Sequence, residues 1–130
     1  MYILDTNTLI YFFKGAGNVA DMLLSKSPKD IGIPAIVLFE LALGIAKSTN
    51  PTKRKIQLDL LVSHVNIFPF GAKEAESAAM IRADLEKKGM PIGPYDTLIA
   101  GTALAANAIL VTHNVREFER VSALTLEDWY

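Results

Sequence analysis

Short apolar runs alternate with longer amphipathic segments along this chain. The short runs are typical of buried strands, because they are too short for independent helices and carry residues that strands favour. We predict strands at 2–4, 31–33, 65–68 and 108–112, and a weak last strand at 124–126. Between them apolar residues recur at helical spacing. We predict helices from residue 6 to near 15, and at 18–26, 34–46, 53–63, 71–88, 95–107 and 116–121.

This order of elements predicts an α/β protein with a parallel sheet and helices on both faces. No repeat, low-complexity tract or linker interrupts the 130 residues, so we expect a single domain over 1–130. Two helices carry apolar sets that we expect to face inward. These sets are Ile56, Leu60 and Leu61 in the first helix, and Ala75, Ala78, Ala79, Ile81 and Leu85 in the second.

Composition narrows the class of protein. A hydrophobic fraction of 51% and a charged fraction of 21% indicate a soluble globular chain. The absence of cysteine excludes disulfides and thiol chemistry, and it fits a cytoplasmic location. Asp5 interrupts the apolar start, so no signal peptide is expected, and the apolar stretch 31–46 is too short for a membrane span. The net charge of −1 creates no global attraction for nucleic acid, although 13 Lys and Arg residues can form a local patch.

Four acidic residues stand out by their context. Asp5 ends the first strand, Glu40 lies in an almost wholly apolar helix, Asp96 opens a helix and Glu117 follows the fourth strand. Each has a plainer interpretation alone: Asp5 and Asp96 suit helix N-caps, Glu40 suits a solvated edge or an Arg partner, and Glu117 suits the surface. Because the carboxyl ends of parallel strands share one edge of the sheet, we expect the four to converge there.

Converging carboxylates repel one another, and a divalent cation relieves that repulsion. Mg²⁺ and Mn²⁺ prefer carboxylate and water oxygens. Zinc is disfavoured, because the chain has no cysteine and only 2 histidines. A carboxylate site for Mg²⁺ suits phosphodiester hydrolysis, in which the metal activates water and stabilises the leaving oxygen.

The segments that carry these acids resemble PIN-domain ribonucleases. The matching segments are Leu4–Asn7, Phe39–Gly44, Pro91–Gly101 and Leu110–Val121, and the ending Leu126–Trp129 is similar to the VapC toxins of bacterial type II toxin–antitoxin modules. The resemblance implies a three-layer α/β/α sandwich with a central, mostly parallel sheet of four to five strands. It also implies an endoribonuclease that depends on Mg²⁺ or Mn²⁺, with transfer RNA as the substrate of some members.

The resemblance assigns roles to the four acids. Asp5 and Asp96 match the metal-binding acids of the family. Glu40 matches a third acid, which holds metal or polarises the attacking water. Glu117 matches a fourth, more variable acid, and Asn114 is a rival for that position. The rivalry arises because the family often has Asn or Asp directly after the fourth-strand Thr, where this chain has His113.

Other residues near these motifs have expected supporting roles. Thr6 and Thr112 match hydroxyl residues that orient acids or water in the family. Arg116 and Arg120 lie beside the proposed site and suit contacts with substrate phosphate. The only dense basic run, Lys53-Arg54-Lys55, suits either RNA backbone or a solvated helix start.

The resemblance further implies partners. It predicts a homodimer and a cognate VapB-type antitoxin, whose helix lies in a groove while its polar tail reaches the acidic pocket. DNA would then be contacted only through the antitoxin. Two alternatives remain at this point: a receiver-like phospho-acceptor domain, and a catalytically silent binding module of the same fold. The first lacks support, because no acidic pair follows the first strand and no Lys follows the fourth.

Overall fold

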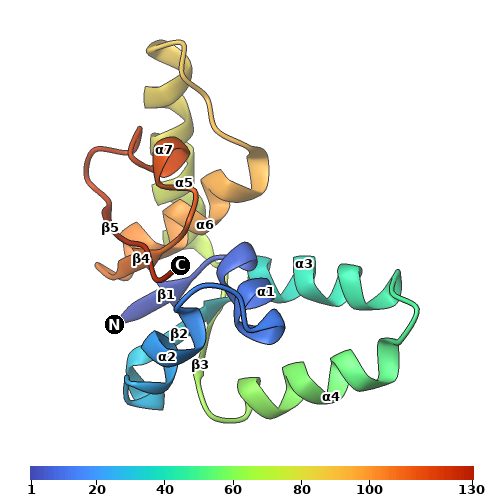
Figure 1. Cartoon of the computed structure of the whole chain (residues 1–130). Coiled ribbons are helices and arrows are strands. Elements are labelled where there is room, and N and C mark those ends of the chain that lie inside the picture. The colour runs from blue at the N-terminus through green and yellow to red at the C-terminus, as the bar shows by residue number, and fades with distance from the viewer.

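Five strands form one parallel sheet at the centre of the molecule (Figure 1). The computed structural model describes residues 1–130. The strand order is β3-β2-β1-β4-β5 and every neighbouring pair is parallel, which confirms the predicted sheet. The strands are β1 (Tyr2–Leu4), β2 (Ile31–Pro34), β3 (Asn66–Phe68), β4 (Ile109–Val111) and β5 (Thr125–Glu127).

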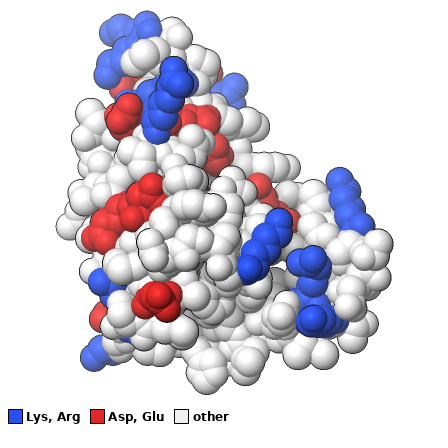
Figure 2. All heavy atoms as spheres, viewed as in Figure 1, with Lys and Arg blue, Asp and Glu red and all other residues white.

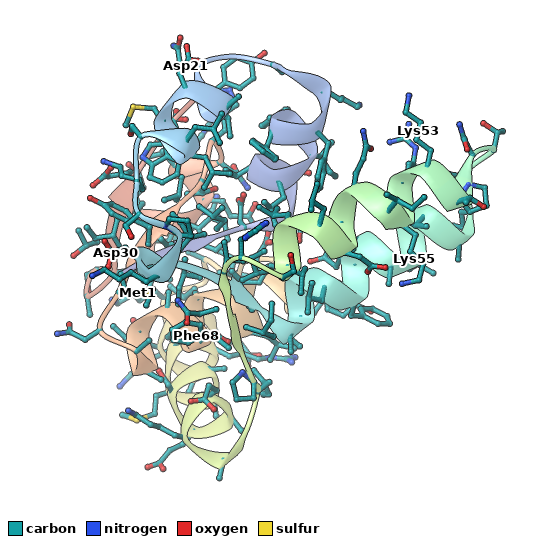
Figure 3. All side chains as sticks on the ribbon, turned by 90° about the horizontal axis from the view of Figure 1, so that it is seen from below. Met1, Asp21, Asp30, Lys53, Lys55 and Phe68 are labelled. Atoms are coloured by element: carbon teal, nitrogen blue, oxygen red, sulfur yellow. The ribbon has the colours of Figure 1, made fainter.

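Helices cover both faces of this sheet, as the alternating pattern predicts. The pair α1 and α2 lies on one face, and the pair α5 and α6 lies on the other (Figures 1 and 3). An antiparallel hairpin of α3 and α4 projects from the side of the molecule. The helices are α1 (Thr6–Lys14), α2 (Val19–Leu24), α3 (Ala35–Ala46), α4 (Pro51–Val62), α5 (Ala72–Lys87), α6 (Pro94–Ala105) and α7 (Val115–Phe118), with a 3₁₀ turn at Pro28–Asp30. None of them has the length and apolar character that a membrane span requires.

The core lies around the two central strands. Ile3 and Leu4 of β1 and Leu110 and Val111 of β4 are completely buried, because helices cover both faces of a central parallel strand. β1 ends directly before Asp5, whose backbone N–H donates to the Val111 carbonyl at 3.2 Å. The packing of β1 against β4 therefore sets Asp5 beside the residues that follow β4.

The predicted inward face of α4 is only partly correct, because Leu61 is half-buried against the core while the other two predicted residues are exposed. Ile56 and Leu60 are 62% and 64% exposed, whereas Leu58 is buried. The helix carries apolar residues on more than one side, so spacing alone does not identify the side that packs. In Figure 3 the side chains of Lys53 and Lys55 point to opposite sides of α4, away from the molecule. A helix that projects in this way buries only the side that faces its hairpin partner.

The prediction for α5 is partly correct. Ala78, Ile81 and Leu85 are buried, but Ala75 and Ala79 are exposed. The buried side meets α6 at very short range, since a Cβ atom on Gly101 would lie 2.8 Å from the backbone nitrogen of Ala78. This close approach leaves no room for a larger residue at Gly101.

We expect Gly101→Ala to destabilise the fold by about 2 kcal/mol, because a methyl group there forces the α5 and α6 backbones apart. Urea unfolding measures the change. Gly44→Ala is the matched control, because no atom lies within 4 Å of a Cβ at that helical glycine. It is expected to stabilise the protein by up to about 1 kcal/mol. Equal changes in the free energy of unfolding in the two variants would contradict the close packing of α5 and α6 as the cause.

Candidate active site

Asp5 is held from two sides at the end of β1. Its Oδ1 accepts a hydrogen bond from the Thr8 backbone N–H at 2.8 Å, so the plainer N-cap interpretation is correct for α1. Its Oδ2 accepts from the Thr112 hydroxyl at 2.6 Å. The residue is only 4% exposed. Burial raises the pKa of this carboxyl, although both hydrogen bonds act in the opposite direction and the charge of Asp128 adds to the rise.

Glu40 lies on α3 and reaches toward the start of α1. Its Oε1 accepts a hydrogen bond from the Thr6 hydroxyl at 2.8 Å. Glu40 is half-buried and belongs to no ion pair, so the alternative in which an Arg neutralises it is wrong. Thr6 follows Asp5 directly, and this contact brings the α3 acid to the edge where Asp5 lies.

Asp96 occupies the first turn of α6 without capping it. The N-cap residue is Gly93, and the cap interpretation of Asp96 is wrong because Pro94 starts the helix two residues before it. Burial raises the pKa of Asp96 to about 6, with further contributions from the charges of Glu117, Asp5 and Glu40, in that order. The four acids therefore share one electrostatic environment.

Glu117 and Asn114 take different positions, although the sequence makes them rivals. The Gly93 backbone N–H donates to Glu117 Oε1 at 2.9 Å, and the Asn114 side-chain amide donates to Oε2 at 2.7 Å. These two bonds lower the pKa of Glu117, with the Gly93 contribution the largest. Asn114 thus holds Glu117, and the carboxylate of Glu117 lies within electrostatic reach of Asp96.

No Lys or Arg forms an ion pair with these four acids. The ion pairs of the chain join Lys55 to Asp59, Arg82 to Glu86, Lys88 to Asp84, and His113 to Asp128. In Figure 2 basic side chains lie over the α3–α4 hairpin and its junction with α1, and a second group lies at the top of the molecule. The four carboxylates therefore have no ion-pair partner, although the charge of Arg120 acts on Glu117.

The two arginines that are candidates for binding substrate phosphate differ in their surroundings. Arg120 donates from Nη1 to the Pro91 carbonyl at 3.0 Å, and its charge contributes to the lowered pKa of Glu117. Arg116 is exposed and forms no ion pair. Arg120 thus braces the loop before α6, while Arg116 is available to a ligand.

The donor atoms at this edge are carboxylate and hydroxyl oxygens, with no thiol. Such a set fits a hard divalent cation and not zinc. No group of three or more Asp, Glu or His side chains is close enough to hold a metal ion in this arrangement. The four carboxyl groups therefore stand apart. The pKa of Asp96 is raised first by burial and then by the charges of the other three acids, which is consistent with a site that lacks a neutralising cation.

Two residues that contribute to the site are not among the candidates that the sequence indicates. Gly93 bonds Glu117 through its backbone, and a Cβ there would lie 3.4 Å from Asp96 Oδ2. Its place directly before the Pro that starts α6 was a usable signal. Asp128 affects Asp5 through its charge, and although it lies in the matching segment Leu126–Trp129, nothing local in the sequence indicates that it lies close to Asp5.

Comparison with known proteins places the chain in a family. The sequence profile described as "PIN domain" matches residues 2–124. The chain therefore belongs to the PIN-domain family, and within that family to the VapC ribonucleases. It is 38% identical to Ribonuclease VapC2 of Rickettsia felis, over 99% of this chain and 98% of that protein. It is 34% identical to the tRNA(fMet)-specific endonuclease VapC of Salmonella typhimurium, over 98% and 97% of the two chains.

A solved structure supports the same assignment. The crystal structure of VapBC2 from Rickettsia felis bound to a DNA fragment from their promoter contains a chain that superimposes with a TM-score of 0.92. That chain is 38% identical, and the match covers 99% of this protein and 98% of the other. The predicted three-layer α/β/α fold is therefore confirmed.

Proposed function

We propose that this protein is an endoribonuclease toxin that depends on Mg²⁺ or Mn²⁺ and is controlled by a cognate antitoxin. The observation that carries the proposal is the set of four carboxylates at one sheet edge, with no basic partner and with the pKa of Asp96 raised to about 6. The relatives named as ribonucleases support the choice of RNA as substrate.

Asp5 and Asp96 would hold the metal, and Glu40 and Glu117 would complete the site. When bound, the cation supplies an activated water and stabilises the leaving oxygen. The chain supplies orientation: the Thr112 hydroxyl fixes Asp5, and the Thr6 hydroxyl fixes Glu40. The Gly93 N–H keeps Glu117 ionised and pointed toward Asp96, because it donates to that carboxylate.

Substrate binding needs positive charge near the acids. We assign phosphate contacts to Arg116, which is exposed and free of ion pairs, and to Arg120, whose charge already reaches Glu117. Transfer RNA is the first substrate to assay, because one relative is named for the tRNA(fMet) that it cleaves. Acting on cellular RNA, the toxin would work in the cytoplasm.

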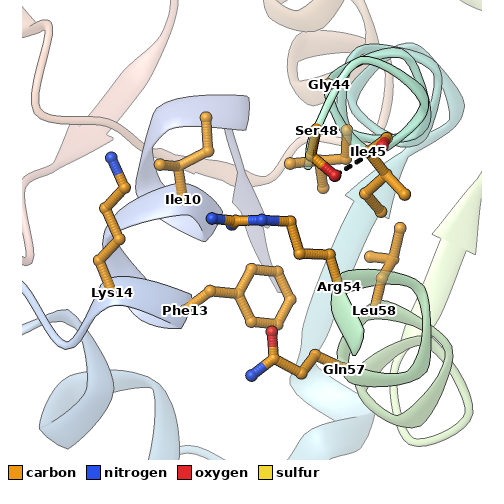
Figure 4. A pocket seen from close by; sticks show the side chains of 10 residues that line it. Ile10, Phe13, Lys14, Gly44, Ile45, Ser48, Arg54, Gln57 and Leu58 are labelled. Carbon is orange, nitrogen blue, oxygen red and sulfur yellow. Dashed lines mark hydrogen bonds between the residues drawn. The ribbon is translucent and has the colours of Figure 1, made fainter. Parts of the chain in front are cut away.

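The cleft between α1, α3 and α4 is a suitable site for an antitoxin helix (Figure 4). Its volume is about 320 Å³, and apolar side chains including Phe13, Leu41 and Leu58 line it. Lys14 and Arg54 lie at the same cleft and would attract an acidic residue on the helix. Two solved neighbours are VapBC assemblies bound to DNA, and we assign DNA contact to the antitoxin alone.

We also propose that the toxin forms a homodimer. Phe39 and Leu43 on α3 are 49% and 43% exposed, and Tyr95 packs edge-on against Phe39 while remaining 45% exposed. A helix that is apolar around most of its circumference is normally covered. A second copy of the chain is the partner that the family resemblance implies.

The alternatives are less well supported. The family match argues against a receiver-like phospho-acceptor domain. A catalytically silent module would not need four unneutralised carboxylates at one edge, because their mutual repulsion reduces stability.

A chelation experiment tests the proposed activity. The purified chain, free of antitoxin, is expected to cleave a structured RNA with Mg²⁺ and to lose that activity in EDTA, with recovery when excess Mg²⁺ is restored. RNA fragments are followed on a denaturing gel, and Asp5→Asn purified in parallel reports contaminating nucleases. Cleavage at the full rate in EDTA would contradict the proposal.

A further inference from the structure

The turn between β4 and α7 connects two of the four acids. The Thr112 hydroxyl donates to Asp5 at 2.6 Å and accepts from the Asn114 backbone N–H at 3.0 Å. The Asn114 side chain in turn donates to Glu117 at 2.7 Å. The conformation of residues 112–114 therefore sets the positions of acids that come from β1 and α7.

The middle residue of this turn, His113, has no core packing to fix it. Its side chain is 46% exposed. Its Nδ1 lies 3.0 Å from an Asp128 carboxylate oxygen. Its ring stacks on Tyr130, with centroids 4.2 Å apart and an interplanar angle of 21°, and Tyr11 of α1 meets it edge-on at 5.9 Å. The side chains of Asp128, Tyr130 and Tyr11, which all lie outside the turn, therefore hold His113 in place of core packing.

The Tyr130 ring is itself held in place. Its backbone N–H donates to Asp128 Oδ1 at 2.9 Å, and its carbonyl accepts from the Asn18 N–H at 2.8 Å. Gly17 allows this approach, because it has a φ of +59° and a Cβ there would lie 2.6 Å from the Tyr130 carbonyl oxygen. The segment 128–130 is therefore docked on the α1–α2 loop and presents a fixed surface to His113.

We propose that Asp128 and Tyr130 are positioning residues for RNA cleavage, which act through His113 to hold the 112–114 turn. Neither belongs to the four-acid set. Thr112 is buried and also bonded to the Glu127 carbonyl at 2.9 Å, so it keeps its place without them. Asn114 is the part that loosens, and Glu117 then keeps its bond from Gly93 but loses the bond that fixes its Oε2. This inference rests on the proposed ribonuclease activity.

Asp128→Ala and Tyr130→Ala test the proposal. Each is expected to lower kcat by about tenfold, as loss of an orienting contact does, with the KM for RNA unchanged within about twofold. Asp128→Asn keeps an acceptor for His113, and Tyr130→Phe keeps the stacked ring, so both are expected to retain kcat. Hydrogen exchange of the 113–117 backbone amides is expected to accelerate in the alanine variants alone, with or without metal.

Leu124→Ala is the control for general destabilisation. Leu124 is buried near the same edge strand and has no part in the cluster, so its truncation is expected to lower the Tm with kcat unchanged. Wild-type kcat in both alanine variants, unchanged amide exchange, or an equal loss of kcat in Leu124→Ala would overturn the proposal. An inactive wild-type protein would instead refute the ribonuclease assignment, and the exchange measurement still tests the cluster in that case.

Discussion

Asp5→Asn is expected to reduce RNA cleavage by about 10³-fold without destabilising the fold. Asn is as good an N-cap as Asp, so the bond from the Thr8 N–H is kept. The new amide N–H₂ can donate to the Thr112 hydroxyl oxygen, but the hydroxyl hydrogen then loses its acceptor on residue 5, which costs about 1–3 kcal/mol. The substitution also removes a charge from a position where burial raises the pKa of the carboxyl. The lost acceptor and the removed buried charge act in opposite directions, so unfolding in EDTA at pH 7.5 should require nearly the same temperature as in the wild type.

Asp5→Ala separates the two roles of this residue. It removes both hydrogen bonds, so it is expected to destabilise the protein by about 1–3 kcal/mol and to be as inactive as Asp5→Asn. RNA cleavage and thermal unfolding are measured on the same preparations. Activity of Asp5→Asn within tenfold of the wild type would show that the carboxylate is a structural cap alone.

The sequence predicts the sheet well, because its signals are local. Runs such as Tyr2–Leu4 are apolar, short and followed by polar residues, and the alternation with helices leaves few topologies. The convergence of Asp5, Glu40, Asp96 and Glu117 follows from that topology, since parallel strands end at one edge. The structure places the four in one electrostatic environment, as the charges acting on Asp96 indicate.

The features that the sequence does not reveal depend on contacts between distant residues. Apolar residues lie on several sides of α4, so the choice of Leu58 over Ile56 and Leu60 depends on where α3 lies. The bond from Gly93 to Glu117 joins the loop before α6 to α7 across 24 positions, and no periodicity marks it. His113 likewise has an ordinary loop context until Asp128 and Tyr130 are brought beside it.

Asp96 is expected to make the metal-free protein less stable as the pH rises. Its pKa is 3.8 in a model peptide and about 6 in the folded chain, so the folded state binds more protons between these values. The stabilisation is complete below pH 3.8 and is lost as the pH rises through about 6. The full pKa shift corresponds to about 3 kcal/mol in the free energy of unfolding. Solvent screening at this partly exposed site reduces that contribution to about 1–2 kcal/mol.

Asp96→Asn isolates this effect and also removes a proposed metal ligand. In EDTA, the free energy of unfolding of the wild type is expected to fall relative to the variant between pH 4.5 and 7.5, by the same amount of about 1–2 kcal/mol. The raised pKa of Asp5 also lowers the free energy of unfolding as the pH rises. The lowered pKa of Glu117 has the opposite effect, at lower pH. Both residues are present in the two proteins, so their effects cancel in the comparison. At pH 7.5, millimolar Mg²⁺ is expected to raise the Tm of the wild type alone, because only the intact set of acids binds it. A pH profile and a Mg²⁺ response identical in the two proteins would mean that Asp96 neither shares its charge with the other acids nor holds the metal.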